Sequence, residues 1–333
     1  MNQEHVLSDE LKKSPSNGEK KLATEEEQLK IYEVRKLLGQ LSGKGAIYCS
    51  DSCISRYLRA RNWHVKKAAK MLKESLKWRE EYKPEDIRWA DVAHEAETGK
   101  MYRANYLDKY GRTVIIMRPQ YQNTKSVKNQ IKLLVYCMEN AILNLSPDQE
   151  KMVWLIDFNG FNMSHLSFKQ TKETASVLQN QYPERLGLAL LYDAPKLFEP
   201  FWTVAKAVLE PKTYNKVKFV YSGHPNTSKM MENFFDLDKL ESAFGGKNSA
   251  VFDINKYAER MKDDDLKIPS FWATQSLTSD VSVPPPSLDG LKIDSISEPS
   301  DEEEINYSLL NSGRETPDFG SNHLESPCPT PPK

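Results

Sequence analysis

The chain has 333 residues, of which 39% are hydrophobic and 28% are charged, a composition typical of a soluble protein with a sizeable core. Its net charge of −1 hides an asymmetry, because Gln275 to Lys333 carries 11 acidic and 3 basic residues and the remainder 43 basic and 36 acidic. No stretch reaches the roughly 20 apolar residues that cross a bilayer, and the polar first ten residues lack the apolar core of a signal peptide. The sequence therefore predicts a cytoplasmic protein.

Motifs for metal binding and catalysis are missing. The four cysteines, Cys49, Cys53, Cys137 and Cys328, form no C-x-x-C pair, so we expect no metal site, and we expect Cys49 and Cys53 to be small buried thiols. Gly246-Lys247 does not complete a phosphate-binding loop, and no G-x-S-x-G elbow is present. We therefore expect no enzymatic activity.

The N-terminal third predicts a small helical module. Residues 1–23 are polar and are expected to be disordered. A first helix starts at the capping-box sequence Thr24–Glu27 and is expected to end at Gly43. Two further amphipathic helices are predicted over 51–62 and 65–82, which gives a helical module over 24–95.

From residue 96 the pattern changes to apolar strands that alternate with helices, which is typical of an α/β layer with a largely parallel sheet. We expect this second domain to span 96–274. The predicted strands are 102–107, 113–117, 151–158, 188–192 and 217–222. The predicted helices are 126–145, 167–180, 195–209, 227–235 and 237–244.

The last segment, 275–333, is rich in Pro and Ser and is expected to be a disordered acidic tail. It holds 9 of the 19 prolines. Four positions fit phosphorylation by proline-directed or acid-directed kinases: Ser300, Thr316, Ser326 and Thr330. We hypothesise that this tail covers the basic surface of the globular part and weakens its docking on anionic membranes; a solubilising tail is the alternative.

Two groups of residues stand out before any resemblance is considered. Ile54, Leu58 and Arg61 are spaced to share one helix face, which points a guanidinium at a core. The spacing favours a buried ion pair over an anionic ligand site. The predicted helix 195–209 has a bulky apolar face, which indicates either packing on the sheet or a lid over an apolar cavity that meets a membrane.

Several stretches resemble the CRAL-TRIO family of lipid-binding proteins, and within it the phosphatidylinositol/phosphatidylcholine transfer proteins. They are SRYLRARNWHVKKAAKMLKESLKWREEY, VWLIDFNGFN, LQNQYPERLGLALLYDAPKLFEPFWTVAKAVLEPKTYNKVKFV and FGGK. The resemblance covers about 24–265. It implies an α/β bowl with a deep apolar pocket for one lipid, closed by a helical gate. On this chain the gate and membrane-contact positions are Phe198, Phe201, Trp202 and Val208.

The resemblance also assigns headgroup residues. The family's phosphoinositide-binding Arg, Glu and Lys fall on Arg61, Glu184 and Lys216, whereas a neighbouring family Lys is replaced by Asn62. The hydroxyl residues that bind the phosphatidylcholine headgroup in the family fall on Met152 and Trp154. The resemblance thus favours phosphatidylinositol over phosphatidylcholine.

The predicted function is to bind a single phospholipid, most simply phosphatidylinositol, and to exchange it between membranes or present it to lipid kinases. An arginine suits a phosphate and a glutamate suits inositol hydroxyls. The alternatives are a carrier of a sterol, tocopherol or retinoid, and a membrane adaptor that transfers nothing. We expect a monomer with no cofactor beyond the bound phospholipid, which associates transiently with anionic membranes and not with nucleic acid.

Overall fold

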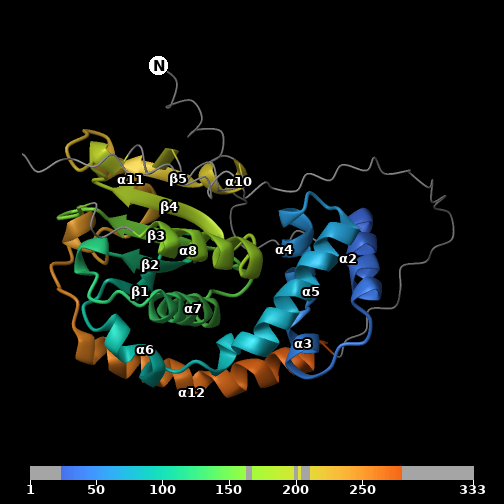
Figure 1. The fold of residues 1–333 in the computed structure, drawn as a ribbon. Helices are drawn as coiled ribbons and strands as arrows, with labels where there is room; N and C mark the ends of the chain where they lie inside the picture. The colour runs from blue at the N-terminus through green and yellow to red at the C-terminus, as the bar shows by residue number, and fades with distance from the viewer. Residues whose placement is uncertain (1–23, 163–166, 199–201, 204–210, 280–333) are drawn as a thin grey trace, which may run out of the picture. The chain divides into compact units, whose positions relative to one another are not determined.

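The computed structural model describes residues 24–162, 167–198, 202–203 and 211–279 (Figure 1). The expectations for 1–23, for 280–333 with its phosphorylation positions, and for Phe201 and Val208 lie outside these residues. All described residues belong to one compact unit, Met1–Pro286. None of the helices within them combines the length and the apolar character needed to span a bilayer.

Four helices form the N-terminal module: α2 (Glu25–Leu38), α3 (Gly43–Tyr48), α4 (Asp51–Ala60) and α5 (Val65–Tyr82). The predicted capping box is present, with the Thr24 hydroxyl accepting from the amide of Glu27. The expected stop at Gly43 is wrong: α2 ends at Leu38 because Gly39 takes φ 76°, which favours glycine, and Gly43 begins α3. The module has its own apolar core, which includes Ile31, Val34, Ile54, Leu58 and Leu72.

The second part is built on a five-stranded sheet of order β1-β2-β3-β4-β5. β1 (Met101–Leu107) pairs antiparallel with β2 (Thr113–Met117), and the other neighbours pair in parallel. The remaining strands are β3 (Met152–Asp157), β4 (Leu186–Tyr192) and β5 (Val217–Val220). The predicted α/β class with a largely parallel sheet is confirmed.

The helices and short 3₁₀ turns around the sheet follow the same order. They are η1 (Pro84–Asp86), α6 (Trp89–Ala96), η2 (Pro119–Tyr121), α7 (Val127–Leu143), α8 (Phe168–Gln181), η4 (Lys196–Phe198), α10 (Pro211–Tyr214), α11 (Thr227–Phe234), η5 (Ser242–Phe244) and α12 (Ile254–Ser279).

One face of the sheet carries the crossover helices. Arg103 of β1 pairs with Ile115 of β2, and its Nε donates to Asn140 of α7 at 2.6 Å, so α7 lies on the face of Ile115. Ile115 is in register with Trp154 and, through it, with Ala189, so these side chains share that face. Because parallel crossovers are right-handed, α8 belongs to the same face, as Figure 1 shows.

The opposite face is covered by the segment that follows α11. Tyr102 and Tyr106 of β1 both donate to the carboxylate of Glu241. Phe244 packs edge-on against Tyr192 of β4, with 5.5 Å between the ring centroids. This face is therefore closed, and any ligand space has to be sought on the side of α7 and α8.

Three further expectations about elements are wrong. Within 237–244 only the η5 turn forms, because the carbonyls of Leu237 and Leu240 accept from the amides of Lys247 and Asn248, at 2.7 and 3.0 Å, and not from amides one helical turn further on. α6 and α12 were not expected at all. The helix α12 also continues to Ser279, so residues 275–279 are helical where the tail was expected to begin.

The predicted burial of Cys49 and Cys53 is confirmed. Cys49, Cys53 and Cys137 are free and buried. Burial raises the pKa of the Cys49 and Cys137 thiols to about 12, so these side chains stay neutral and unreactive at physiological pH. Cys328 lies outside the described residues.

Candidate functional site

The sheet face on the side of α8 is apolar and incompletely covered. Met117, Ile156 and Phe219 lie in register across β2, β3, β4 and β5 and are only half-buried, although β3 is the central strand. With Val217 beside them, we call these four residues the open sheet face. Among the side chains of α8 that the structure describes, none is buried, and this helix packs on α7 and α5. An apolar surface of this kind suits a hydrophobic ligand.

Two of the four predicted gate residues can be placed. Phe198 is 5% exposed and packs against Phe158, with 4.7 Å between the ring centroids. Trp202 is half-buried and meets Phe219 of the open sheet face edge-on at 5.6 Å. The two described gate positions therefore pack against β5 and against the residue that follows β3.

Met152 and Trp154 lie on β3 and project to the same side as α7. Met152 is fully buried, and Trp154 is 8% exposed. The indole Nε1 of Trp154 is buried without a hydrogen-bond partner among the described residues. At this position the chain therefore offers a buried hydrogen-bond donor.

The amino-terminal edge of the sheet is polar. Each of the four parallel strands is directly preceded by a basic residue, and parallel strands begin at the same edge. These four residues are Arg112, Lys151, Arg185 and Lys216. At this edge the Nζ of Lys216 lies 3.2 Å from Oε2 of Glu184, and the two side chains are 21% and 14% exposed. The structure therefore brings two of the three predicted headgroup residues into direct contact.

Arg61, the third predicted headgroup residue, lies at the end of α4. It is half-buried, and its Nη1 donates to the carbonyl of Ala60 at 3.1 Å. The next residue, Asn62, accepts a hydrogen bond from Lys212 of α10 at 2.5 Å. Because α10 leads directly into Lys216 and β5, this contact sets the end of α4 beside the polar edge of the sheet.

The prediction that Arg61 is the guanidinium on the apolar face of its helix is wrong. The helix α4 ends at Ala60, so Arg61 is its C-cap and leaves the helical spacing. The buried guanidinium is that of Arg56, which is 6% exposed and pairs with Glu150 at 2.7 Å. Arg59 reaches the second oxygen of Glu150 at 2.6 Å. Burial would raise the pKa of Glu150, but the two arginines hold it below its ordinary value.

Sequence reasoning missed Lys151, which sits beside this pair. Lys151 is half-buried, and its pKa is lowered by burial and by the neighbouring charge of Lys216. None of the ion pairs among the described residues includes Lys151, whereas Lys216 is paired with Glu184. The repeated pattern of a basic residue before each strand was the available signal.

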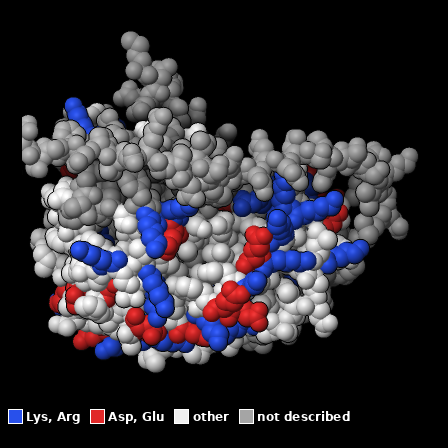
Figure 2. Space-filling view, viewed as in Figure 1, with Lys and Arg blue, Asp and Glu red and all other residues white. Residues whose placement is uncertain are grey.

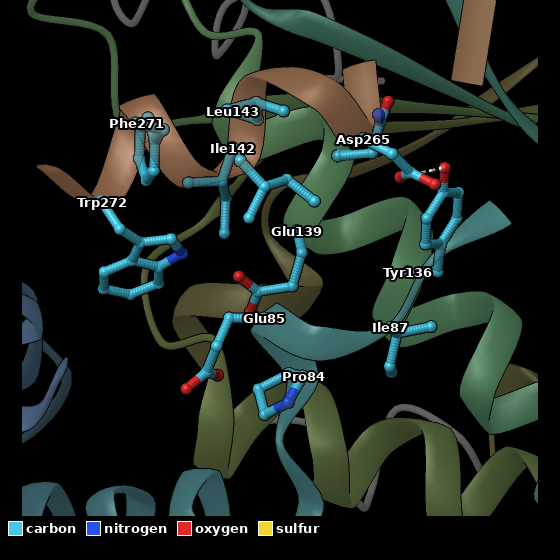
Figure 3. A pocket seen from close by; sticks show the side chains of 12 residues that line it. Pro84, Glu85, Ile87, Tyr136, Glu139, Ile142, Leu143, Asp265, Phe271 and Trp272 are labelled. Atoms are coloured by element: carbon cyan, nitrogen blue, oxygen red, sulfur yellow. Dashed lines mark hydrogen bonds between the residues drawn. The ribbon is translucent and has the colours of Figure 1, made fainter. Parts of the chain in front are cut away.

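A small pocket lies elsewhere, between η1, α7 and α12 (Figure 3). Its walls include Glu85, Glu139 and Trp272, and at one side Figure 3 shows the Tyr136 hydroxyl donating to Asp265, at 3.0 Å. Its volume is about 30 Å³, whereas pockets for organic ligands measure roughly 300–1,000 Å³. This pocket can hold a water molecule but not a lipid.

Comparison with known proteins agrees with this architecture. A family model described as the CRAL/TRIO domain matches residues 96–246, and one described as the CRAL/TRIO N-terminal domain matches residues 9–74. The chain is a CRAL-TRIO domain protein. The resemblance seen in the sequence is thereby confirmed. CRAL-TRIO proteins form a lipid-binding and lipid-transfer family that is generally non-catalytic.

Individual CRAL-TRIO relatives are distant. A CRAL-TRIO domain-containing protein of Schizosaccharomyces pombe is 34% identical over 63% of this chain and 20% of its own length. The phosphatidylinositol transfer protein CSR1 of Eremothecium gossypii is 28% identical over 72% of this chain and 58% of its own. The crystal structure of Sfh5 shares the fold, with a TM-score of 0.58 at 16% identity over 77% of this chain and 99% of that one. The chain thus spans between a fifth and three fifths of these two sequence relatives.

Proposed function

We propose that this protein binds one molecule of phosphatidylinositol and exchanges it between membranes or presents it to a lipid kinase. The observation that carries the proposal is the Lys216–Glu184 pair, 3.2 Å apart, at the amino-terminal edge of the sheet, next to Val217 of the open sheet face. It sets a cation and a carboxylate side by side at the start of β5, the strand that also carries Phe219 of the open sheet face. That arrangement suits a ligand with hydrocarbon chains at one end and an anionic, hydroxyl-rich group at the other.

The apolar part of the ligand would lie on the open sheet face. Each buried CH₂ group contributes about 0.8 kcal/mol, so two acyl chains gain far more from this surface than a headgroup gains from a few hydrogen bonds. The half-buried side chains of Ile156 and Phe219 are the surface on which they would lie. Trp202 packs edge-on against Phe219, so it would have to move for the acyl chains to enter.

The polar part would lie at the strand edge. Lysine and arginine donate charge-assisted hydrogen bonds to a phosphate, and a carboxylate accepts hydrogen bonds from inositol hydroxyls. Lys216, Lys151 and Arg61 are the cations that we assign to the phosphate, and Glu184 is the acceptor that we assign to the hydroxyls. CSR1, which is named a phosphatidylinositol transfer protein, supports this choice of headgroup.

A second candidate ligand is a hydrophobic molecule with one small polar oxygen group, such as a sterol, a tocopherol or a retinoid. The unpartnered Nε1–H of Trp154 favours it, because a buried donor without an acceptor is costly and a ligand oxygen would satisfy it. Such a ligand would not need the charged residues at the polar amino-terminal edge of the sheet.

Transfer of labelled phosphatidylinositol between vesicles tests the proposal. We expect Lys216→Ala and Glu184→Gln to reduce transfer roughly ten- to a hundredfold, since a charged hydrogen bond contributes about 1.5–3 kcal/mol. Lys256→Ala, at an 84% exposed side chain on α12, is the control and should transfer normally. If Lys216→Ala and Glu184→Gln transfer phosphatidylinositol as fast as the Lys256→Ala control, the headgroup assignment is refuted. If the wild type transfers a sterol faster than phosphatidylinositol, the second candidate is favoured.

A further inference from the structure

The helix α5 carries a dense set of lysines on its solvent side. Lys66, Lys70, Lys73 and Lys77 are spaced by four, three and four residues, so they lie on one face, with Lys67 beside them. All five are exposed, and between Val65 and Lys77 they are accompanied by a single acidic residue, Glu74. We call these five residues the α5 lysine face. Figure 2 shows Lys and Arg side chains gathered in the region where Figure 1 places α2, α4 and α5.

The lysines at the start of α5 do not favour the helix, whereas Lys77, further along, forms an exposed pair with Glu81 that is 3.9 Å long. Positive charges in a first turn oppose the helix dipole, and the first turn of α5 contains Lys66 and Lys67 and no acidic residue. Like charges four residues apart, such as Lys66 and Lys70, repel each other. The contrast with α2 is clear, because α2 begins with three glutamates that complement its dipole. An arrangement that weakens its own helix calls for a partner of opposite charge.

A groove runs along this face, between α5 and α2. It has a volume of about 370 Å³ and is lined by six residues: Leu37, Lys66, Ala69, Lys70, Lys73 and Glu74. Leu37 is 44% exposed, and Tyr32 on the same helix is 41% exposed. The groove therefore combines three lysines with an uncovered apolar side chain.

We infer that the α5 lysine face docks on an anionic lipid bilayer, with a lipid phosphate in the groove and Leu37 entering the apolar layer. A juxtaposition of exposed lysines and exposed apolar residues on helices is what a membrane surface recognises. The face holds lysines and no arginine, and lysine acts as a point charge without the fork geometry that specific recognition uses. This docking face is separate from the Lys216–Glu184 site, so it does not depend on which lipid the protein carries.

Vesicle co-sedimentation of the full chain tests the inference. The test variant replaces Lys66, Lys70 and Lys73 by Glu, and the control replaces three exposed lysines on other elements, Lys229, Lys239 and Lys256, by Glu. Each lysine near an anionic surface is worth roughly a fivefold change in binding. We expect the test variant to lose about a hundredfold or more in binding to phosphatidylserine-containing vesicles at low salt, and the control to lose much less.

Folding is checked in the same samples. Because the lysines repel one another, replacing all three by Gln should leave the melting temperature unchanged or higher while vesicle binding falls. Leu37→Asn should weaken binding at low and at high salt alike, since the contribution of Leu37 is apolar and the replacement is uncharged. Equal losses in the two Glu variants would overturn the inference, as would wild-type binding to pure phosphatidylcholine vesicles that equals its binding to phosphatidylserine-containing vesicles. It would also be overturned if the wild type bound RNA and the test variant lost this RNA binding while it still bound vesicles.

Discussion

Arg79 of α5 donates to both carboxylate oxygens of Glu139 of α7, from Nη1 at 2.9 Å and from Nη2 at 3.2 Å. Arg79 is 6% exposed, and its Nη2 also reaches Glu85 at 3.3 Å. The hydroxyl of Tyr182, at the end of α8, donates to the same Glu139 at 2.7 Å. One buried guanidinium therefore joins the helical module to the helices that cover the sheet, beside the small pocket of Figure 3.

Replacement of this arginine should be strongly destabilising. Arg79→Met removes the cation that pairs with Glu139 and leaves Glu85 only its 3.8 Å contact with Lys44, and breaking a buried ion pair in this way costs about 3–5 kcal/mol. Chemical denaturation monitored by circular dichroism measures the loss. Lys77→Met is the matched control, because its pair with Glu81 is exposed and 3.9 Å long, and it should cost less than about 1 kcal/mol. Similar losses in both variants would show that the Arg79 network does not hold the two parts together.

The same network predicts a dependence on pH. Burial would raise the pKa of Glu139, but Arg79 and the Tyr182 hydroxyl hold it below its ordinary value. A carboxylate whose pKa is lowered by folding stabilises the protein above its unfolded-state pKa, and this contribution is lost as the pH falls through the folded-state pKa. The free energy of unfolding should therefore drop between about pH 5 and pH 3. In Glu139→Gln the drop should be smaller, and an unchanged pH profile would contradict the assignment.

Lys151 should separate function from stability. Its charge is partly buried and lies near that of Lys216, which lowers its pKa, so Lys151→Met should leave the fold as stable as the wild type or more stable. The same change should reduce binding of phosphatidylinositol about tenfold or more, since one charged hydrogen bond is lost. Binding of uncharged diacylglycerol should stay the same, and Lys151→Arg should restore phosphatidylinositol binding. Equal effects on both lipids would place Lys151 outside the headgroup site.

Filling the open sheet face should exclude the ligand. Ile156 is half-buried at the centre of this face, so a tryptophan at this position would occupy the space that the acyl chains need. Ile156→Trp should abolish lipid uptake from vesicles. The control is Lys218→Trp, which adds a large ring on the opposite side of β5, where Lys218 pairs with Leu190. If both variants take up lipid normally, the ligand does not lie on this face.

Phosphatidylcholine should be a poor ligand. Met152 offers only a weakly accepting thioether, so of the two positions only Trp154 can donate to the lipid phosphate, through a single buried indole N–H. Vesicle exchange should therefore be much slower for labelled phosphatidylcholine than for phosphatidylinositol. Comparable rates would show that these two positions do not decide the choice of headgroup.

Local patterns were sufficient to predict much of the fold. The bounds expected for α5, 65–82, and for β2, 113–117, agree with the structure, because apolar periodicity and turn residues mark both elements clearly. α12 escaped prediction because its sequence is polar and includes Pro269. Its buried residues, Tyr257, Met261 and Asp264, are held by contacts with distant strands and helices.

The site was harder to predict than the fold. Glu184 and Lys216 are 32 residues apart in the chain, and their contact arises from the adjacency of β4 and β5, which no local pattern encodes. Arg61 was assigned to the wrong environment because the end of α4 falls one residue before it. The basic residue before each strand can be seen in the sequence, but that Lys151 shares an edge with Lys216 follows only from the parallel register.

Native mass spectrometry of the full chain after incubation with mixed vesicles addresses the central claim most directly. The vesicles would contain phosphatidylinositol and phosphatidylcholine in equal amounts, and the protein would be separated from them before measurement. We predict one lipid per chain, phosphatidylinositol in large excess, and a strong reduction of that adduct in the Lys216→Ala variant. A protein without bound lipid, or one that carries both lipids in proportion to their supply, would contradict the account.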